Sequence, residues 1–228
     1  MSTAGTDSLF VIPVLNLPVT GAVTTMWAIM AVVAVTAWLG TRRLMPVPGR
    51  LQAALELMIE GLQSFFASIL GRARARQFLP LLASLFLLII ASNYAGLLPG
   101  AGHLRWLETP TSNWGTTAGL AIVAFVATTG YGLVVRRLGY FRRFVEPRAL
   151  APVMIPLGII EELTRPFSLS LRLTANVFAG ETLVQTLLSV FPYGLPVVPM
   201  LLEAFFGFIQ ALIFSFLTAI YIHMAIEE

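Results

Sequence analysis

Long apolar stretches alternate with short polar connections along this chain. Residues 21–40, 78–99 and 116–135 carry no charged side chain. A helix of about 20 such residues is long enough to cross the hydrocarbon core of a bilayer. We therefore expect an all-α, polytopic membrane protein. Its first parts are one upright N-terminal span over residues 21–40 and a transmembrane helical hairpin over residues 78–135.

Residues 51–70 follow a different pattern, because their apolar and polar positions separate into two stripes. The apolar stripe contains Leu51, Leu55, Met58, Leu62, Phe65 and Ile69, and the polar stripe contains Gln52, Glu56, Glu60 and Gln63. This pattern is typical of an amphipathic helix that lies in the membrane interface. The alternative is an amphipathic helix packed against a soluble partner.

Two long apolar helices are expected within residues 151–226. At about 1.5 Å per residue, helices over 152–190 and 198–226 would measure about 58 and 43 Å. The hydrocarbon core is only about 30 Å thick. This C-terminal pair should therefore be strongly tilted or bent, and Pro156 and Pro166 are candidate kinks because each removes a backbone donor.

The arginines are distributed unevenly among the connections. Eleven lie in 42–50, 71–76 and 136–148, whereas 99–115 holds one. Basic connections face the cytoplasm. This places residues 1–20 outside and the C-terminus in the cytoplasm, provided that 51–70 does not cross.

Composition supports the membrane assignment and excludes several other classes. The 228 residues are 57% hydrophobic and 11% charged, whereas soluble domains average about 25% charged residues. The net charge is +3, but the arginines lie beside apolar spans, so we expect no nucleic-acid partner.

Cysteine is absent, which excludes disulfides and thiolate metal sites. The two histidines have no metal-ligand spacing, and no phosphate-binding glycine loop is present. We therefore expect no cofactor and no metal.

Arg172 lies within the long apolar segment 152–190 and remains a cation when buried. At about 100° per residue, one line along this helix contains Glu161, Arg165, Ser168, Arg172, Asn176 and Ala179, and Ser170, Thr174, Glu181 and Gln185 lie nearly opposite. A helix with polar residues on two sides cannot face lipid on either. One side is expected to meet a partner subunit and the other a hydrated cavity.

Several polar residues have more than one interpretation. Glu203 and Gln210 share a face of the last helix and belong either to an ion path or to interhelical hydrogen bonds. Glu161 and Glu162, near the cytoplasmic end, either line a cytoplasmic half-channel or are interfacial charges. Asn93 is interpreted as a polar packing group between helices rather than an ion-path residue.

Three segments together resemble subunit a of the F-type ATP synthase membrane sector. The strongest likeness is residues 159–181, IIEELTRPFSLSLRLTANVFAGE, and it continues in 209–214, IQALIF, and in 93–99, NYAGLLP. The resemblance implies that Arg172 is the essential stator arginine and that Asn176 and Gln210 are its polar neighbours. It also implies that Glu181 lines the outer half-channel.

Two positions depart from the family pattern. Thr174 and Ala175 stand where members commonly have Phe-Gly, which should change packing more than mechanism. Glu203 stands where some members carry histidine, and it is included among the expected ion-translocation residues.

The resemblance further implies a function. The chain would supply two offset half-channels and the stator arginine that couple transmembrane proton or Na⁺ flow to rotation of the c-ring, and so to ATP synthesis. It would itself be non-catalytic. The implied partners are the c-ring, b-type peripheral stalk subunits and, through the complex, the soluble ATPase head, in a bacterial inner membrane. The alternatives are a secondary ion transporter, for which no internal repeat is evident, and a non-conducting membrane scaffold.

Overall fold

The computed structural model describes residues 10–12, 17–42, 49–98, 108–136, 151–190 and 197–227. These residues form the helices α1 (Gly21–Thr41), α2 (Arg50–Leu70), α3 (Arg72–Ala95), α4 (Trp114–Arg136), α5 (Ala151–Val190) and α6 (Val197–Glu227). The all-α fold expected from the sequence is confirmed. The structure adds a short antiparallel hairpin, β1 (Phe10–Ile12) with β2 (Leu17–Val19), and the 3₁₀ turn η1 (Pro110–Ser112). Neither was expected.

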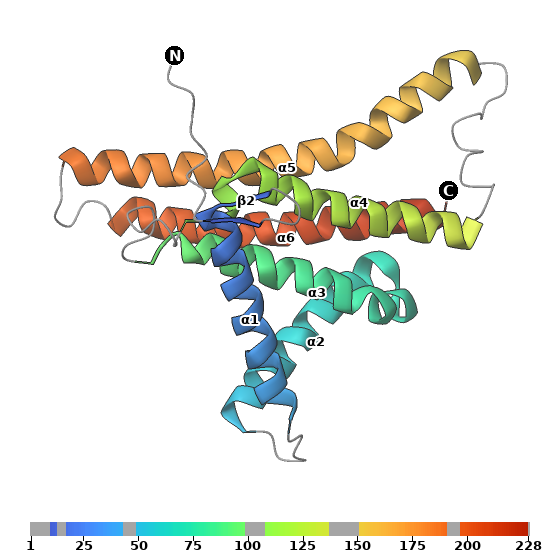
Figure 1. Ribbon diagram of the computed structural model, residues 1–228. Helices are drawn as coiled ribbons and strands as arrows, with labels where there is room; N and C mark the ends of the chain where they lie inside the picture. Colours follow the sequence, from blue (N-terminus) through green and yellow to red (C-terminus); the bar gives the residue numbers. More distant parts are fainter. Residues whose placement is uncertain are drawn as a thin grey trace.

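Four helices run side by side and the first crosses them (Figure 1). α6 packs against α3, α4 and α5, and α4 also packs against α5. α1 runs across the common direction of these four helices, and α2 leads back from the far end of α1 to α3 (Figure 1). If α1 stands upright in the membrane, the hairpin α3–α4 is therefore tilted together with α5 and α6.

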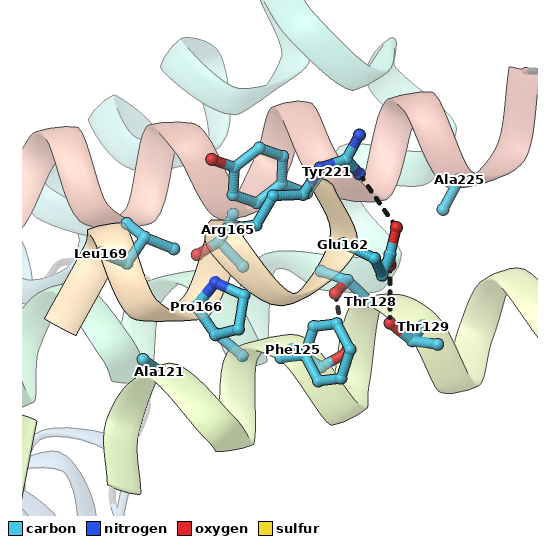
Figure 2. A pocket seen from close by; sticks show the side chains of 12 residues that line it. Ala121, Phe125, Thr128, Thr129, Glu162, Arg165, Pro166, Leu169, Tyr221 and Ala225 are labelled. Carbon is cyan, nitrogen blue, oxygen red and sulfur yellow. Dashed lines mark hydrogen bonds and ion pairs between the residues drawn. The ribbon is translucent and has the colours of Figure 1, made fainter. Parts of the chain in front are cut away.

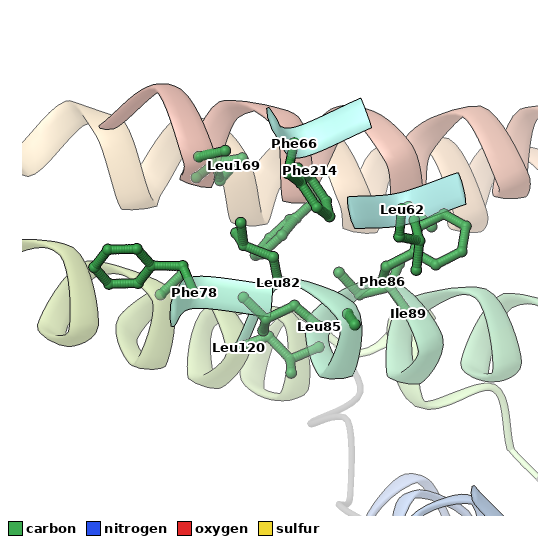
Figure 3. Packing of buried hydrophobic residues seen from close by; sticks show 14 of the residues in the cluster. Leu62, Phe66, Phe78, Leu82, Leu85, Phe86, Ile89, Leu120, Leu169 and Phe214 are labelled. Atoms are coloured by element: carbon green, nitrogen blue, oxygen red, sulfur yellow. The ribbon is translucent and has the colours of Figure 1, made fainter. Parts of the chain in front are cut away.

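The core lies where α2, α3, α4, α5 and α6 meet (Figure 3). Its largest fully buried side chains are Phe66, Leu82, Ile89, Leu173 and Phe214. The buried residues of α2 are Leu62, Phe66 and Leu70. Met58, Phe65 and Ile69 of the expected apolar stripe are partly buried against the same core. Phe66 and Leu70 join the buried face because α2 packs against both α3 and α6.

α3 begins at Arg72, earlier than the expected start at residue 78. Gly71 separates it from α2 with φ +77°, a left-handed conformation that glycine adopts without steric cost. Arg72, Arg74 and Arg76 therefore belong to the first turns of α3 and not to a loop. Pro80 lies inside the helix.

Among the described residues, five helices are long and apolar enough to cross a membrane: α1, α2, α3, α4 and α6. The interfacial placement of α2 thus remains a prediction that rests on its amphipathic pattern and on the distribution of arginines. α5 and α6 have 40 and 31 residues, in agreement with the expected long pair. α5 bends along its length (Figure 1) and contains Pro156 and Pro166. Residues 1–9 and most of the basic connection 136–148 lie outside the described residues.

Candidate functional site

Two contacts fix α5 and α6 as an antiparallel pair. Toward one end, Gly180 of α5 packs against Glu203 of α6 so closely that a Cβ on Gly180 would lie 2.9 Å from the Glu203 Cγ. Toward the other end, the Arg165 guanidinium carbon lies 5.1 Å from the centre of the Tyr221 ring. Arg172 and Gln210 both lie between these two contacts, in the middle part of the pair.

The two sides of α5 have different environments. Leu169, Ser170 and Leu173 are buried against the bundle, and the Thr174 hydroxyl makes a hydrogen bond with Thr117 of α4. Arg172 lies on the opposite side and is exposed. The side that carries Arg172 therefore faces away from the rest of the described chain.

Within the described part of the chain, no carboxylate lies within ion-pairing distance of Arg172. Ala175 and Ala179, on the same side of α5, are exposed as well. Small residues of this kind allow another helix to approach closely. Asn176, one turn further along, is half-buried. The middle of α5 thus presents an unpaired cation beside a surface on which a second helix can pack.

Glu181 and Glu203 form an acid pair across α5 and α6. Glu203 is close enough to Glu181 for the two charges to interact, and it contributes a buried Oε1 without a hydrogen-bond partner in the described residues. Thr109 and Ser112, at η1, lie near Glu181, and the buried Thr109 Oγ1 has no hydrogen-bond partner in the described residues. A Cβ on Gly96 would lie 3.3 Å from the Glu181 Oε1, so glycine at this position leaves room for the carboxylate.

Gln210 is buried, with 6% of its surface exposed. Its Nε2 finds no hydrogen-bond partner in the part of the chain that the structure describes. A buried amide left in that state costs about 1–3 kcal/mol. Gln210 is therefore a buried donor that the described residues leave available to a hydrogen-bond acceptor.

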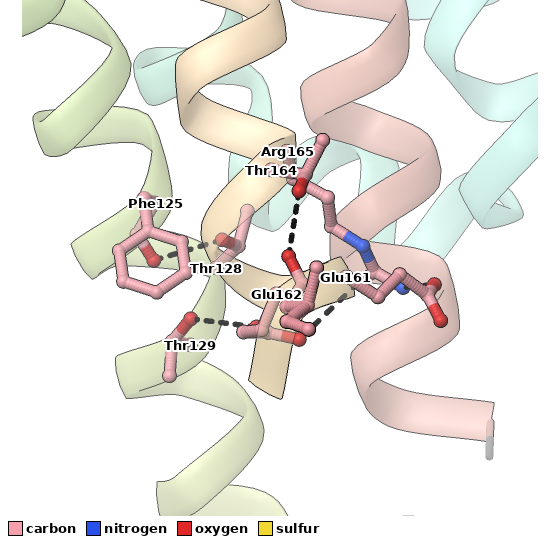
Figure 4. A network of polar contacts seen from close by, with 8 residues as sticks. Phe125, Thr128, Thr129, Glu161, Glu162, Thr164 and Arg165 are labelled. Atoms are coloured by element: carbon pink, nitrogen blue, oxygen red, sulfur yellow. Dashed lines mark hydrogen bonds and ion pairs between the residues drawn. The ribbon is translucent and has the colours of Figure 1, made fainter. Parts of the chain in front are cut away.

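Arg165 is surrounded by partners that together form an arginine clasp, defined here as Glu161, Glu162, Arg165 and Tyr221. Arg165 Nη2 donates to Glu161 Oε1 at 2.7 Å, and Nη1 lies 3.7 Å from Glu162 Oε2 (Figure 4). Glu162 also accepts a hydrogen bond from Thr129 of α4 at 3.3 Å. The clasp therefore connects α4, α5 and α6.

A small cavity adjoins the clasp, with room for about one water molecule. Side chains of α4, α5 and α6 line it, and Glu162, Arg165 and Thr129 supply its polar edge (Figure 2). Glu161 is not among the residues that line it and has 63% of its side chain exposed, compared with 15% for Glu162. Of the two glutamates, Glu162 is the one that borders the cavity.

The profile of the ATP synthase A chain family matches residues 23–223. The chain belongs to this family. A protein of Moorella thermoacetica named ATP synthase subunit a is 36% identical over 209 residues, which is 90% of each chain. Pelobacter propionicus has two similar proteins, named ATP synthase subunit a 3 and subunit a 1. They are 35% and 36% identical over 208 residues, 91% of this chain and 88% of each relative.

In this member of the ATP synthase A chain family, the sequence identified Glu181 and Glu203 as candidate site residues. It did not identify the groups around them. Thr109 and Ser112 were missed, although Pro110 in the run from 109 to 113 is a turn signal. Thr129 and Tyr221 were missed as partners of the clasp because they lie far along the chain from α5. The described residues contain no group of three or more His, Cys, Asp or Glu side chains that could hold a metal ion.

Proposed function

We propose that this chain is the ion-translocating stator subunit of an F-type ATP synthase in a bacterial inner membrane. Its N-terminus would lie outside and its C-terminus in the cytoplasm. The observation that carries this proposal is Arg172, an exposed cation without a partner in the described chain, at the middle of a long helix. Such a residue is costly in a membrane unless a group of another subunit faces it.

In this proposal Arg172 acts on a carboxylate of the rotating c-ring. A fixed cation within about 4–6 Å favours the ionised form of that carboxylate. A bare carboxylate is very costly to move into lipid, so it must first take up an ion. Arg172 therefore releases each ring subunit on one side only after an ion has bound, and it blocks direct leakage between the two sides.

Two polar regions flank Arg172 along α5 and are suited to be the ends of two offset half-channels. The acid pair, with Glu181 about 14 Å away along the helix axis, belongs to the outer half-channel. Glu162, about 15 Å away in the opposite direction, belongs to the cytoplasmic one together with Glu161. Asn176 and Gln210 are the polar neighbours of Arg172 between these regions. Each charge moved through 100 mV contributes about 2.3 kcal/mol.

The partners that follow are the c-ring, the b-type peripheral stalk and, through the complex, the soluble ATPase head. An affinity-tagged chain purified from native membranes in mild detergent tests this assignment. We expect it to co-isolate with a ring of small hairpin subunits and with ATPase activity. Isolation without a ring and without ATPase activity would instead favour a transporter or a scaffold.

The coupling ion is determined by the same preparation after reconstitution into vesicles. ATP synthesis should be measured at fixed pH while the sodium gradient alone is varied. A rate that follows the sodium gradient identifies Na⁺, and a rate that follows only the pH gradient identifies H⁺.

A further inference from the structure

Asn93, near the C-terminal end of α3, is buried and makes hydrogen bonds to two segments distant in the sequence. Its Nδ2 donates to the Gly207 carbonyl of α6 at 3.0 Å, and its Oδ1 accepts from the Thr111 hydroxyl of η1 at 2.8 Å. Asn93 is 4% exposed and Thr111 is fully buried. A Cβ on Gly207 would lie 3.1 Å from the Asn93 Cβ. Asn93 therefore holds α6 and η1 against α3 with fixed geometry.

η1 is a short turn whose position depends on such contacts. It packs against α1, α3, α4 and α5, with Pro110 and Thr111 buried. The Ser112 hydroxyl donates to the Thr109 carbonyl at 2.9 Å and closes the turn. Because three residues cannot form a stable helix alone, the position of this turn depends on its packing against these helices and on the buried hydrogen bond from Thr111 to Asn93.

The turn places two hydroxyl groups at the acid pair. The Thr109 Oγ1 and the Glu181 Oε1 both lie beside Gly96, where a Cβ would be 2.5 Å from the first and 3.3 Å from the second. The Thr109 hydroxyl has no hydrogen-bond partner in the described residues, and Ser112 lies near the same carboxylate. The titratable groups that face Glu181 among the described residues are Glu203 of α6 and Glu108, which precedes η1. With two acids nearby and no cation described beside it, the groups available to orient Glu181 are neutral hydroxyls.

We propose that Asn93 is a positioning residue for ion transfer at the acid pair. Through Thr111 it fixes η1, and η1 holds the hydroxyls of Thr109 and Ser112 against Glu181. Asn93 thus acts on Glu181 through Thr111 and η1. This inference rests on the proposed role of Glu181 in the outer half-channel, and it assigns to Asn93 more than the packing role expected from the sequence.

The test compares two substitutions of Thr111 in the whole complex. Thr111→Val keeps the shape of the buried side chain but removes the donor to Asn93, whereas Thr111→Ser keeps the hydroxyl. ATP-driven ion pumping into inverted vesicles is measured per assembled complex. We expect Thr111→Val to lower pumping about fivefold, the effect of roughly one lost hydrogen bond on the rate. Thr111→Ser should retain most of the pumping rate.

Repeating Thr111→Val in a Glu181→Gln background separates positioning from packing. If the hydrogen bond acts through Glu181, the Thr111 substitution has no further effect once that carboxylate is gone. Ser92→Ala is the matched control, because Ser92 is a fully buried neighbour on α3 whose hydroxyl contacts the Met26 sulfur at 3.6 Å. It should leave pumping unchanged.

Each alternative outcome has a distinct meaning. An equal loss in both backgrounds, or an equal loss with Thr111→Ser, would overturn the positioning role and leave packing. Unchanged pumping in Glu181→Gln alone would contradict the proposed function of Glu181 instead. If Thr111→Val fails to assemble, Ser112→Ala replaces it, since this half-buried residue loses only a hydroxyl. Unchanged pumping in that variant would equally overturn the inference.

Discussion

Two arginines on the same helix, Arg165 and Arg172, have opposite surroundings. Arg165 has 13% of its side chain exposed and lies between Glu161, Glu162 and the ring of Tyr221. Arg172, about 10 Å further along the helix axis, is exposed and has no carboxylate partner within the described ranges. The first charge is neutralised inside the chain, and the second is left available.

This difference separates a structural arginine from one that can act on another subunit. Arg165 connects three helices, because Glu162 also binds Thr129 of α4 and Tyr221 belongs to α6. Arg172 makes no ion pair within the described chain, and a cation at the middle of a membrane helix is costly without a partner. We therefore propose that Arg165 serves assembly and that Arg172 serves coupling.

The largest expected effect follows from removing the available charge. Arg172→Ala should abolish ATP synthesis driven by an imposed ion gradient while leaving assembly of the complex intact, because Arg172 makes no ion pair that holds the described helices together. Arg172→Lys should also fail, since a buried lysine can lose its proton. Gradient-driven synthesis in vesicles measures both. Gradient-driven ATP synthesis in either variant would show that Arg172 is not required for coupling and so does not differ from Arg165 in this respect.

A smaller effect is expected at the acid pair. Glu181→Gln should slow ion flux by roughly tenfold, or about 1.4 kcal/mol on the limiting barrier, and should not abolish it. The remaining carboxylate of Glu203 lies beside it and can still exchange an ion. To test this contribution of Glu203, ion flux is measured in vesicles for the Glu181→Gln variant and for the double variant that carries Glu181→Gln and Glu203→Gln. Identical flux in the single and double variants would exclude a contribution from Glu203.

Arg165→Gln should affect stability rather than coupling. It leaves Glu162, with 15% of its side chain exposed, without its cation and so should destabilise the complex by about 1–3 kcal/mol. The ratio of ATP made to ions carried, per assembled complex, should equal that of the wild type. Thermal inactivation and this ratio are measured on the same preparation. A lowered ratio with normal stability would show that Arg165 belongs to the coupling machinery.

The smallest effect is expected from Glu161→Gln. Glu161 has 63% of its side chain exposed, and an exposed pair four residues apart on a helix contributes about 0.3–0.5 kcal/mol. Glu162→Gln should cost more, because Glu162 has only 15% of its side chain exposed and its charge faces the equally buried Arg165. Thermal inactivation of the two variants side by side tests the order. Equal losses would mean that the clasp does not distinguish its two glutamates.

The sequence predicted the helices and the two polar sides of α5 because both depend on local periodicity. Arg172 and Glu181 lie on opposite sides of one helix whatever surrounds it. The hydroxyls around Glu181 and the partners of Arg165 could not be predicted in this way. Thr109, Thr129 and Tyr221 reach α5 only through the packing of α4, η1 and α6, and single-sequence periodicity carries no information about such distant pairs. For the same reason, burial of Phe66 and Leu70 of α2 was not predicted.

The central claim is that Arg172 faces a carboxylate of a moving neighbour. The structure of the assembled complex, determined in lipid with the ring in place, tests this claim most directly. We expect the Arg172 guanidinium to lie within about 4–6 Å of a ring carboxylate or its bound water, with no acid of its own chain closer. A guanidinium surrounded by lipid, or paired with a carboxylate of its own chain, would contradict the account.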